Sequence, residues 1–298
     1  MITHTRRILT FVSFMLLIAS FSIAHAEDKH WLKPYILASD APGKLSDAVN
    51  TVKNNLKNSD FSVAGEYSPY KNAHIIVISS KALQQHAAET KFGGYGAAIR
   101  VGLTQVGDNV QVSYVNPEWM SGMYRMKSDL ADIRAALAKV LGAEKDFGTS
   151  ELWAREDLED YHYTVFMPYF DDPLKLAHYD SHAAAVKAVE AGLAAHKGGT
   201  KKIYSINIPG KDEVLYGVGI EKSDGSDTTV MTATDIAKYK HTAHLPYDML
   251  VSGDTVYALH GKFRIAQSFP DLTMTTFMKI SDAPDAIEET LKKVAGKE

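Results

Sequence analysis

The pattern of apolar and polar positions predicts a series of strands and helices in the first half of the chain. Apolar residues at helical spacing over 45–56 and 130–140 predict amphipathic helices, and residues 81–90 have the pattern of a shorter one. Residues 99–103 and 110–114 alternate on either side of a Gly-Asp turn, which is typical of a hairpin. Further strand patterns lie at 34–38 and 61–67, and at 73–78, where a continuous apolar run indicates a buried strand.

The second half predicts the same elements in the same order. Apolar positions at Val186, Val189 and Leu193 indicate a helix, and a strand through 245–249 enters a second Gly-Asp turn. The other predicted elements are strands at 163–167, 203–208 and 214–220, a short helix at 235–239, and a last helix that ends near residue 296.

Matching positions in the two halves keep nearly constant offsets. Val189 and Leu193 lie 137 positions after Val52 and Leu56, and the offset grows to 146 at the second hairpin and 154 at the last helix. Loop insertions between two copies of one unit would produce this drift. Strand pairs interrupted by helices, without regular βαβ alternation, predict an α+β fold. We therefore expect two tandem copies of a compact sandwich, each a mostly antiparallel sheet covered by helices.

The segment 143–160 is charged and lacks a strand pattern, so we expect it to link the two copies. The chain then divides into a signal peptide at 1–26, a first α+β module at 27–142, the linker at 143–160 and a second α+β module at 161–298. Modules of about 120–140 residues are large enough to bury a core of their own.

The N-terminus has the three parts of a cleavable secretory signal. Arg6 and Arg7 precede an apolar run over 8–23, which ends in Ala24-His25-Ala26. The run is short for a spanning helix, which needs about 20 apolar residues. We expect cleavage after Ala26 and a soluble periplasmic protein without a membrane span.

Composition excludes several classes of chemistry. The formal net charge is −4 and the charges are dispersed, so the chain has no electrostatic footprint for nucleic acid. There is no cysteine, which excludes disulfides, thiol nucleophiles, iron–sulfur clusters and covalently attached haem.

The hairpin of the first half carries a family resemblance. Ile99-Arg100-Val101-Gly102-Leu103 and the segment from Gly107-Asp108 to Tyr114-Val115-Asn116-Pro117 resemble the bacterial domain-of-unknown-function family three-hundred-and-two. The resemblance covers most of residues 34–142 and implies a compact α+β sandwich, but no established reaction. In the second half His260-Gly261-Lys262-Phe263 replaces Tyr114-Val115-Asn116-Pro117, so a function tied to the Asn-Pro corner is not expected in that copy.

Two tandem modules form an interface, and ligands often bind at such interfaces. We predict a ligand or partner site at Arg100, Tyr114, Asn116 and Trp119 of the better-matched copy. Aromatic residues between Tyr161 and Phe170 could line a ligand cleft or lie in the core; the sequence allows both.

Methionine and histidine residues offer an alternative metal site. Met120, Met123 and Met126 are spaced by three, and thioether sulfur suits copper(I). His241 and His244, with His260 on the partner strand of a hairpin, could converge on copper or zinc. The competing interpretation is that the methionines fill the core and the histidines are surface or capping residues.

These patterns favour a binding function over catalysis. The sequence contains neither a G-x-S-x-G elbow nor an S-x-x-K motif, although an enzyme with dispersed site residues stays open. Our leading hypothesis is an exported, non-enzymatic binding or accessory protein for an unknown small molecule or periplasmic protein. The alternative is a periplasmic protein that handles copper or zinc.

Overall fold

The strand pairs predicted from the sequence assemble into two antiparallel sheets. A computed structural model of the chain describes residues 29–297, and the residues from Trp31 onward form one compact unit. The predicted signal peptide lies outside the described residues. Within them, no helix combines the length and the apolar character needed to cross a membrane.

The first sheet is built entirely from the first half and the segment that follows it. Its strands, in spatial order, are β2 (Ser62–Tyr67), β3 (Ala73–Ser79), β4 (Ile99–Val106), β5 (Asn109–Val115), β1 (Tyr35–Pro42) and β6 (Lys145–Phe147). All neighbouring strands pair antiparallel, and the predicted Gly-Asp turn joins β4 to β5.

The second sheet has the same plan. Its strands, in spatial order, are β8 (Thr200–Asn207), β9 (Glu213–Ile220), β10 (Tyr247–Ser252), β11 (Thr255–Ala258) and β7 (Leu174–His178). Again all neighbours pair antiparallel, so the described chain is of the α+β class, as the sequence predicts.

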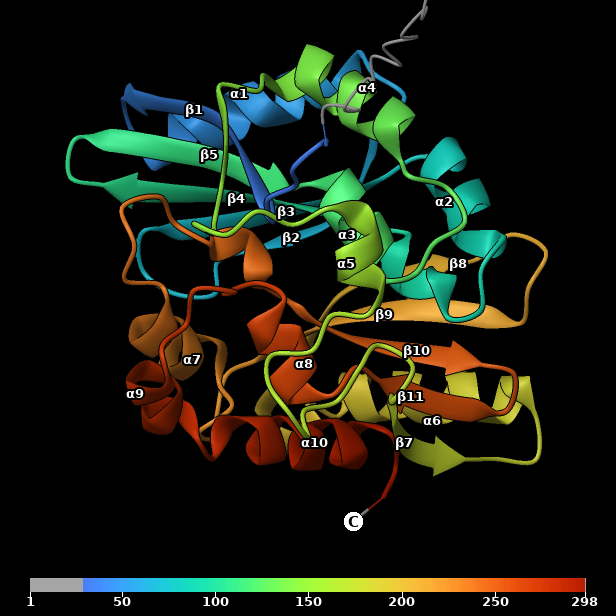
Figure 1. Ribbon diagram of the computed structural model, residues 1–298. Coiled ribbons are helices and arrows are strands. Elements are labelled where there is room, and N and C mark those ends of the chain that lie inside the picture. Colours follow the sequence, from blue (N-terminus) through green and yellow to red (C-terminus); the bar gives the residue numbers. More distant parts are fainter. Residues whose placement is uncertain (1–28, 298) are drawn as a thin grey trace, which may run out of the picture. The chain divides into compact units, whose positions relative to one another are not determined.

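Helices cover the outer face of each sheet (Figure 1). Helix α1 packs on the first sheet with α4 beside it, and α6 packs on the second sheet with α10 beside it. The helices of the first half and the connecting segment are α1 (Leu45–Lys57), α2 (Lys81–Ala88), η1 (Gly93–Gly96), α3 (Pro117–Met123), α4 (Ala131–Leu141) and α5 (Arg155–Glu159). Those of the second half are α6 (His182–Ala194), η2 (Lys197–Gly199), α7 (Asp227–Thr234), η3 (Thr242–His244), α8 (Gly261–Ala266), α9 (Met274–Phe277), η4 (Met278–Ile280) and α10 (Ala283–Val294).

The main strands and helices of the two halves come in the same order. In each, a strand and a helix precede a strand pair, a short helix and a hairpin, and the first strand then adds beside the last strand of the hairpin. The register also shifts within the equivalent pairs β2–β3 and β8–β9. This shared order is what a duplicated unit would have, and the duplication itself remains our inference.

Equivalent elements also meet at the contact between the halves. Strand β2 contacts β8. Each half also places a single-turn helix against the sheet of the other half: η1 lies against β9 and β10, and η3 lies against β3, β4 and β5. A Cβ at Gly102 of β4 would come within 2.7 Å of the Ala243 backbone nitrogen, so glycine allows η3 to approach the strand. The inner faces of both sheets are thereby buried, and the interior strands β4 and β9 are covered on both sides.

Two predicted elements are wrong. Residues 163–167 form no strand, and the strand that opens the second module is β7, whose Leu176 and Ala177 are buried beside β11. Val165 and Phe166 are exposed instead, and Phe166 has a left-handed φ of 68°. Aromatic and β-branched residues favour a strand only where a neighbouring strand and a core surface receive them.

The short helix predicted at 235–239 forms earlier in the chain, as α7. Ser226 caps its first turn by accepting the Thr229 backbone N–H, and the helix ends at Thr234. Asp235 is then used outside the helix, where its carboxylate accepts the His241 backbone N–H at 2.9 Å. The helix therefore begins after its capping residue Ser226, earlier in the chain than the apolar pattern predicts.

The segment 143–160 contains regular structure that its sequence pattern did not indicate. Strand β6 adds to the edge of the first sheet beside β1, and α5 packs against α3. A three-residue edge strand is too short to show an alternation pattern, so only its pairing with β1 reveals it.

Candidate binding site

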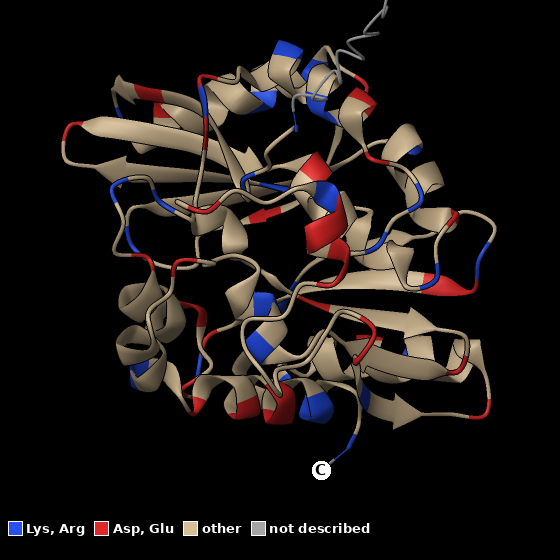
Figure 2. Ribbon diagram, in the orientation of Figure 1, with Lys and Arg blue, Asp and Glu red and all other residues tan. Residues whose placement is uncertain are grey.

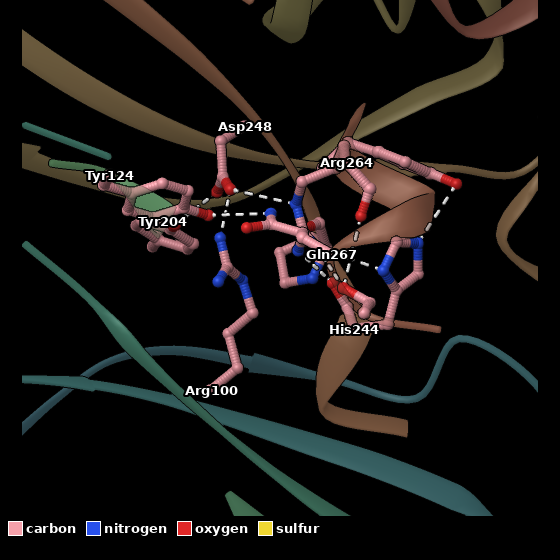
Figure 3. Close-up of polar contacts among 10 residues, drawn as sticks. Arg100, Tyr124, Tyr204, His244, Asp248, Arg264 and Gln267 are labelled. Carbon is pink, nitrogen blue, oxygen red and sulfur yellow. Dashed lines mark hydrogen bonds and ion pairs between the residues drawn. The ribbon is translucent and has the colours of Figure 1, made fainter. Parts of the chain in front are cut away.

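A buried group of polar side chains joins the two halves (Figure 3). Arg100 of β4 forms an ion pair with Asp248 of β10, from Nη2 to Oδ2, and both side chains are only 1% exposed. Tyr204 of β8 donates its hydroxyl to Oδ1 of Asp248 at 2.6 Å. Burial and the adjacent carboxylate of Asp248 raise the pKa of Tyr204 well above its usual value, so the phenol stays protonated.

Arg264 of α8 is the second guanidinium in this group. Its Nε lies 3.9 Å from Oδ2 of Asp248, and its Nη1 donates to Oγ of Ser268 at 2.8 Å and to Nδ1 of His244 at 3.0 Å. Its Nη2 donates to the His244 and Pro246 carbonyl oxygens. Burial, with Arg264 and Arg100 nearby, holds the pKa of His244 well below its usual range, so this imidazole is neutral.

A small cavity lies beside the two guanidinium groups. Its volume is about 20 Å³, and it is lined by Pro34, Tyr35, Arg100, Val115, Trp119, Met120, Tyr124, Arg264, Gln267 and Ser268. A space of this size holds a water molecule or a small ion but no organic ligand.

The structure separates the four residues predicted to bind a ligand. Arg100 and Trp119 line the small cavity, where Trp119 Nε1 donates to the Gln267 carbonyl oxygen at 3.2 Å. Tyr114 is buried and donates its hydroxyl to the Gly142 carbonyl oxygen at 3.0 Å. Asn116 is buried at the N-cap of α3, where Oδ1 accepts the Glu118 backbone N–H and Nδ2 donates to the Lys33 carbonyl oxygen. All four side chains are buried, form contacts within the protein and lie at no open surface.

The methionine and histidine candidates for a metal site have separate packing or capping roles, and all but the half-buried His260 are buried. Met120, Met123 and Met126 all belong to the hydrophobic core. His241 stacks on Phe269 at 4.9 Å and donates Nδ1–H to the Ser268 carbonyl oxygen, and burial lowers its pKa to about 4. His260 caps α8 through Nδ1, which accepts the Lys262 backbone N–H. Within 29–297, no three His, Asp or Glu side chains are placed to hold a metal ion together.

A much larger hollow lies where the connecting segment meets the C-terminal part of the chain. This cleft has a volume of about 580 Å³. Its lining residues are Ser150, Glu151, Trp153, Tyr161, His162, Tyr163, Thr164, Pro270, Asp271, Leu272, Thr273 and Met274. We call it the aromatic cleft, because the rings of Trp153 and Tyr161 meet edge-to-face at 5.3 Å on one wall and Tyr163 stands nearby in the lining.

Hydrogen bonds tie the two walls of the aromatic cleft to each other. Asp271 accepts the Thr149 hydroxyl at 2.7 Å and the Ser150 backbone N–H at 2.8 Å. Tyr163 donates its hydroxyl to the Leu272 carbonyl oxygen. These contacts join segments more than 100 residues apart, so the cleft is shaped before any ligand arrives.

The surroundings of the aromatic cleft are acidic. A second hollow of about 490 Å³ shares Glu151 and Trp153 with it and is otherwise lined by Leu152, Glu156, Asp157 and Asp160. No lysine or arginine of the described chain lines either hollow. Figure 2 shows the acidic residues along α5, next to the cleft-forming segment. Leu152 and Met274 are exposed large apolar side chains on the same segments.

Sequence reasoning missed most of the aromatic cleft. Tyr161 and Tyr163, for which the sequence allows either a cleft or a core position, line the cleft; Tyr161 is also part of the hydrophobic core, as is Phe170, which does not line the cleft. Glu151 and Trp153 fall in the segment expected to be a linker, and Asp271 to Met274 carried no recognisable motif. The accumulation of aromatic and acidic residues over 151–163 was the one available signal.

Scans of protein-family models, curated proteins and solved structures find no match to this chain. The resemblance of residues 99–117 to the domain-of-unknown-function family three-hundred-and-two stays a prediction.

Proposed function

We propose that this chain is an exported, non-enzymatic binding or accessory protein whose ligand lies in the aromatic cleft. The observation that carries the proposal is a cleft of about 580 Å³ with aromatic walls that are already hydrogen-bonded to each other. Clefts of roughly 300–1,000 Å³ with apolar and aromatic linings are typical of small-molecule sites. Export rests on the basic, apolar and small-residue pattern of 1–26.

The chemistry of the lining favours an organic cation as ligand. Faces of tryptophan and tyrosine attract ammonium groups, and the attraction grows where water is excluded. The carboxylates of Glu151 and Asp271, with those of the adjoining hollow, add a negative potential that no lining lysine or arginine opposes. An anionic ligand would meet repulsion here, and a neutral one would gain apolar contacts and hydrogen bonds but no attraction between charges.

Calorimetric titration with choline and with spermidine tests the proposal at two sizes of organic cation. Choline is compared with dimethylbutanol, its uncharged carbon isostere, which keeps the shape and lacks the charge. We expect a cation to bind about tenfold more tightly than the neutral isostere, a difference of about 1.4 kcal/mol. Absence of binding by both cations up to millimolar concentration, or equal binding of choline and its isostere, would contradict the proposal.

A matched pair of variants locates the ligand. Glu151→Gln removes a carboxylate shared by the two hollows, and should weaken cation binding severalfold with little effect on folding because the side chain is exposed. Glu289→Gln makes the same change on an exposed face of α10, and should leave affinity unchanged. Equal losses in the two variants would indicate a general charge effect and not a ligand in this cleft.

A further inference from the structure

The buried polar group between the two halves has an unbalanced positive charge. Arg100 and Arg264 are 1% and 3% exposed, and Asp248 is the carboxylate that both face. The Tyr204 phenol stays protonated and supplies no second negative charge, and the neutral His244 adds no further positive one. The group therefore contains two guanidinium ions and one carboxylate.

A further carboxylate that acts on the wall of this cavity, Asp235, is already engaged elsewhere. Asp235 accepts the His241 backbone N–H at 2.9 Å, and Lys240 is the cation that acts on it. It influences Tyr35 at the wall of the small cavity but forms no ion pair with either arginine. A buried unpaired charge is strongly unfavourable, so a further negative charge is expected near the guanidinium ions.

Two hydrogen-bond donors without acceptors also indicate that a negatively charged group is missing here. Nε of Arg100 and Nε of Arg264 are both buried, and neither has a hydrogen-bond partner among the described residues. Both side chains line the cavity of about 20 Å³, together with Gln267, Ser268, Tyr124 and Tyr35. The cavity is thus bounded by two cations and by neutral side chains, and no carboxylate lines it.

We propose that this cavity is a structural anion site that binds one halide ion, chloride under ordinary conditions, between Arg100 and Arg264. A water molecule fits the volume and could accept from the free Nε–H groups, but it leaves the excess charge in place. An organic anion is too large for the cavity. A halide matches the volume, the charge and the donors together. The site is independent of the aromatic cleft, since the two share no lining residue.

The site would join the two halves of the molecule. Arg100 and Trp119 come from the first half, whereas Arg264, Gln267 and Ser268 come from the second. An ion bound between them stabilises the folded state by mass action, since the unfolded chain does not assemble the cavity. A higher halide concentration should therefore raise the midpoint temperature of thermal unfolding.

Crystals grown with sodium bromide in place of chloride test the site in the unmodified protein. An anomalous difference peak at the bromine edge, within the cavity and in contact with both arginines, is the expected result. Density without an anomalous peak would identify a water molecule and overturn the proposal. A bromide ion found only on the surface would overturn it as well.

Thermal unfolding provides the matching solution experiment. At constant ionic strength, replacing sodium gluconate by sodium chloride should raise the midpoint by about 2–4 °C.

Gln267→Glu places a carboxylate at the cavity wall, and this internal counter-charge should abolish the chloride dependence. Glu289→Gln is the control and should respond to chloride as the wild type does. Undiminished chloride dependence in Gln267→Glu would show that halides act elsewhere. Should that variant fail to fold, the bromide crystals still decide the question.

Discussion

At the residue scale, a single buried carboxyl links the first half to a helix of the second. Asp227 opens α7 and is only 3% exposed. Its Oδ2 accepts the hydroxyl of Tyr67 from β2 at 2.8 Å, and its Oδ1 accepts the Ile220 backbone N–H at 3.2 Å. Burial raises the pKa of Asp227 from 3.8 to about 7, against the opposing effect of these two hydrogen bonds.

This raised pKa predicts a loss of stability as pH increases. Between about pH 4 and pH 7 the folded state holds a proton that the unfolded chain has released, so the free energy of unfolding falls across that range. Above pH 7 the charged carboxylate is buried and the full cost applies, about 4 kcal/mol at most. We expect Asp227→Asn to reduce the fall in stability between pH 5 and pH 8, as measured by urea unfolding.

The control for this prediction lies three residues away. Asp224 is exposed in the loop that precedes α7, so Asp224→Asn should unfold with the pH dependence of the wild type. His241 and Asp235 also titrate abnormally, but they are present in every variant and cancel in the comparison. A wild-type pH dependence in Asp227→Asn would show that the carboxyl is not the responsible group.

Arg100 and Asp248 show which part of the buried polar group could be predicted from the sequence and which part could not. Arg100 was selected as a site residue because its segment carries a family resemblance, and the structure places it at a cavity. Its partner Asp248 could not be foreseen, since it lies 148 positions away in a mostly apolar strand. Pairing over such a distance depends on how the sheets face each other, which no local pattern encodes.

At the element scale, close backbone approach at Gly102 is a specific test of the contact between β4 and η3. A Cβ there would meet the Ala243 nitrogen at 2.7 Å and the Thr242 Cβ at 3.0 Å. Gly102→Val should therefore destabilise the protein by about 3 kcal/mol or more, because backbone and not a flexible side chain must move. Chemical denaturation measures the change.

A second valine substitution controls for the change in strand propensity. Ser62 of β2 is exposed, and Ser62→Val adds similar bulk without a facing element. We expect this variant to stay within about 0.5 kcal/mol of the wild type. If Gly102→Val were equally harmless, the packing of η3 on the first sheet would need revision.

Elements differ in how far their sequences specify them. The long helices α1, α6 and α10 and the hairpin β4–β5 follow patterns that their own residues carry, and the structure confirms them. Residues 163–167 have equally good strand composition but no strand beside them, and they remain irregular. A strand requires a partner, so its existence is decided outside its own segment.

At the scale of the whole molecule, the contact between the halves predicts cooperative unfolding. The single-turn helices η1 and η3, the β2–β8 contact and the Arg100–Asp248 pair all cross between the predicted modules. Separation of the halves would expose apolar surface on both and break the Arg100–Asp248 pair. We expect one calorimetric transition whose calorimetric enthalpy equals the van't Hoff enthalpy.

Two resolved transitions would contradict this prediction and would mean that each half is stable by itself. Arg100→Met offers an informative comparison, because it removes the ion pair between the halves and changes no residue of the shared hydrophobic core. A shift from one transition towards two in this variant would show that the ion pair couples the halves.

The sequence alone determined the classes of elements, the α+β fold and their repeated order. These properties follow from the spacing of apolar residues, from turn glycines and from capping residues, all of which act within a few positions. It also supplied the expectation of export, which rests on residues 1–26 and lies outside the described part of the chain.

The tertiary structure decided where the candidate binding sites lie. The aromatic cleft forms because Asp271 and Leu272 are bonded to the connecting segment, and the small cavity forms because α8 meets β4. It also placed the predicted methionines, the histidines, Tyr114 and Asn116 in packing, hydrogen-bonding or capping roles, whereas Arg100 and Trp119 line the small cavity. A site assembled from segments more than 100 residues apart depends on long-range packing, whereas sequence patterns report only the local preferences of the backbone and the burial of its faces.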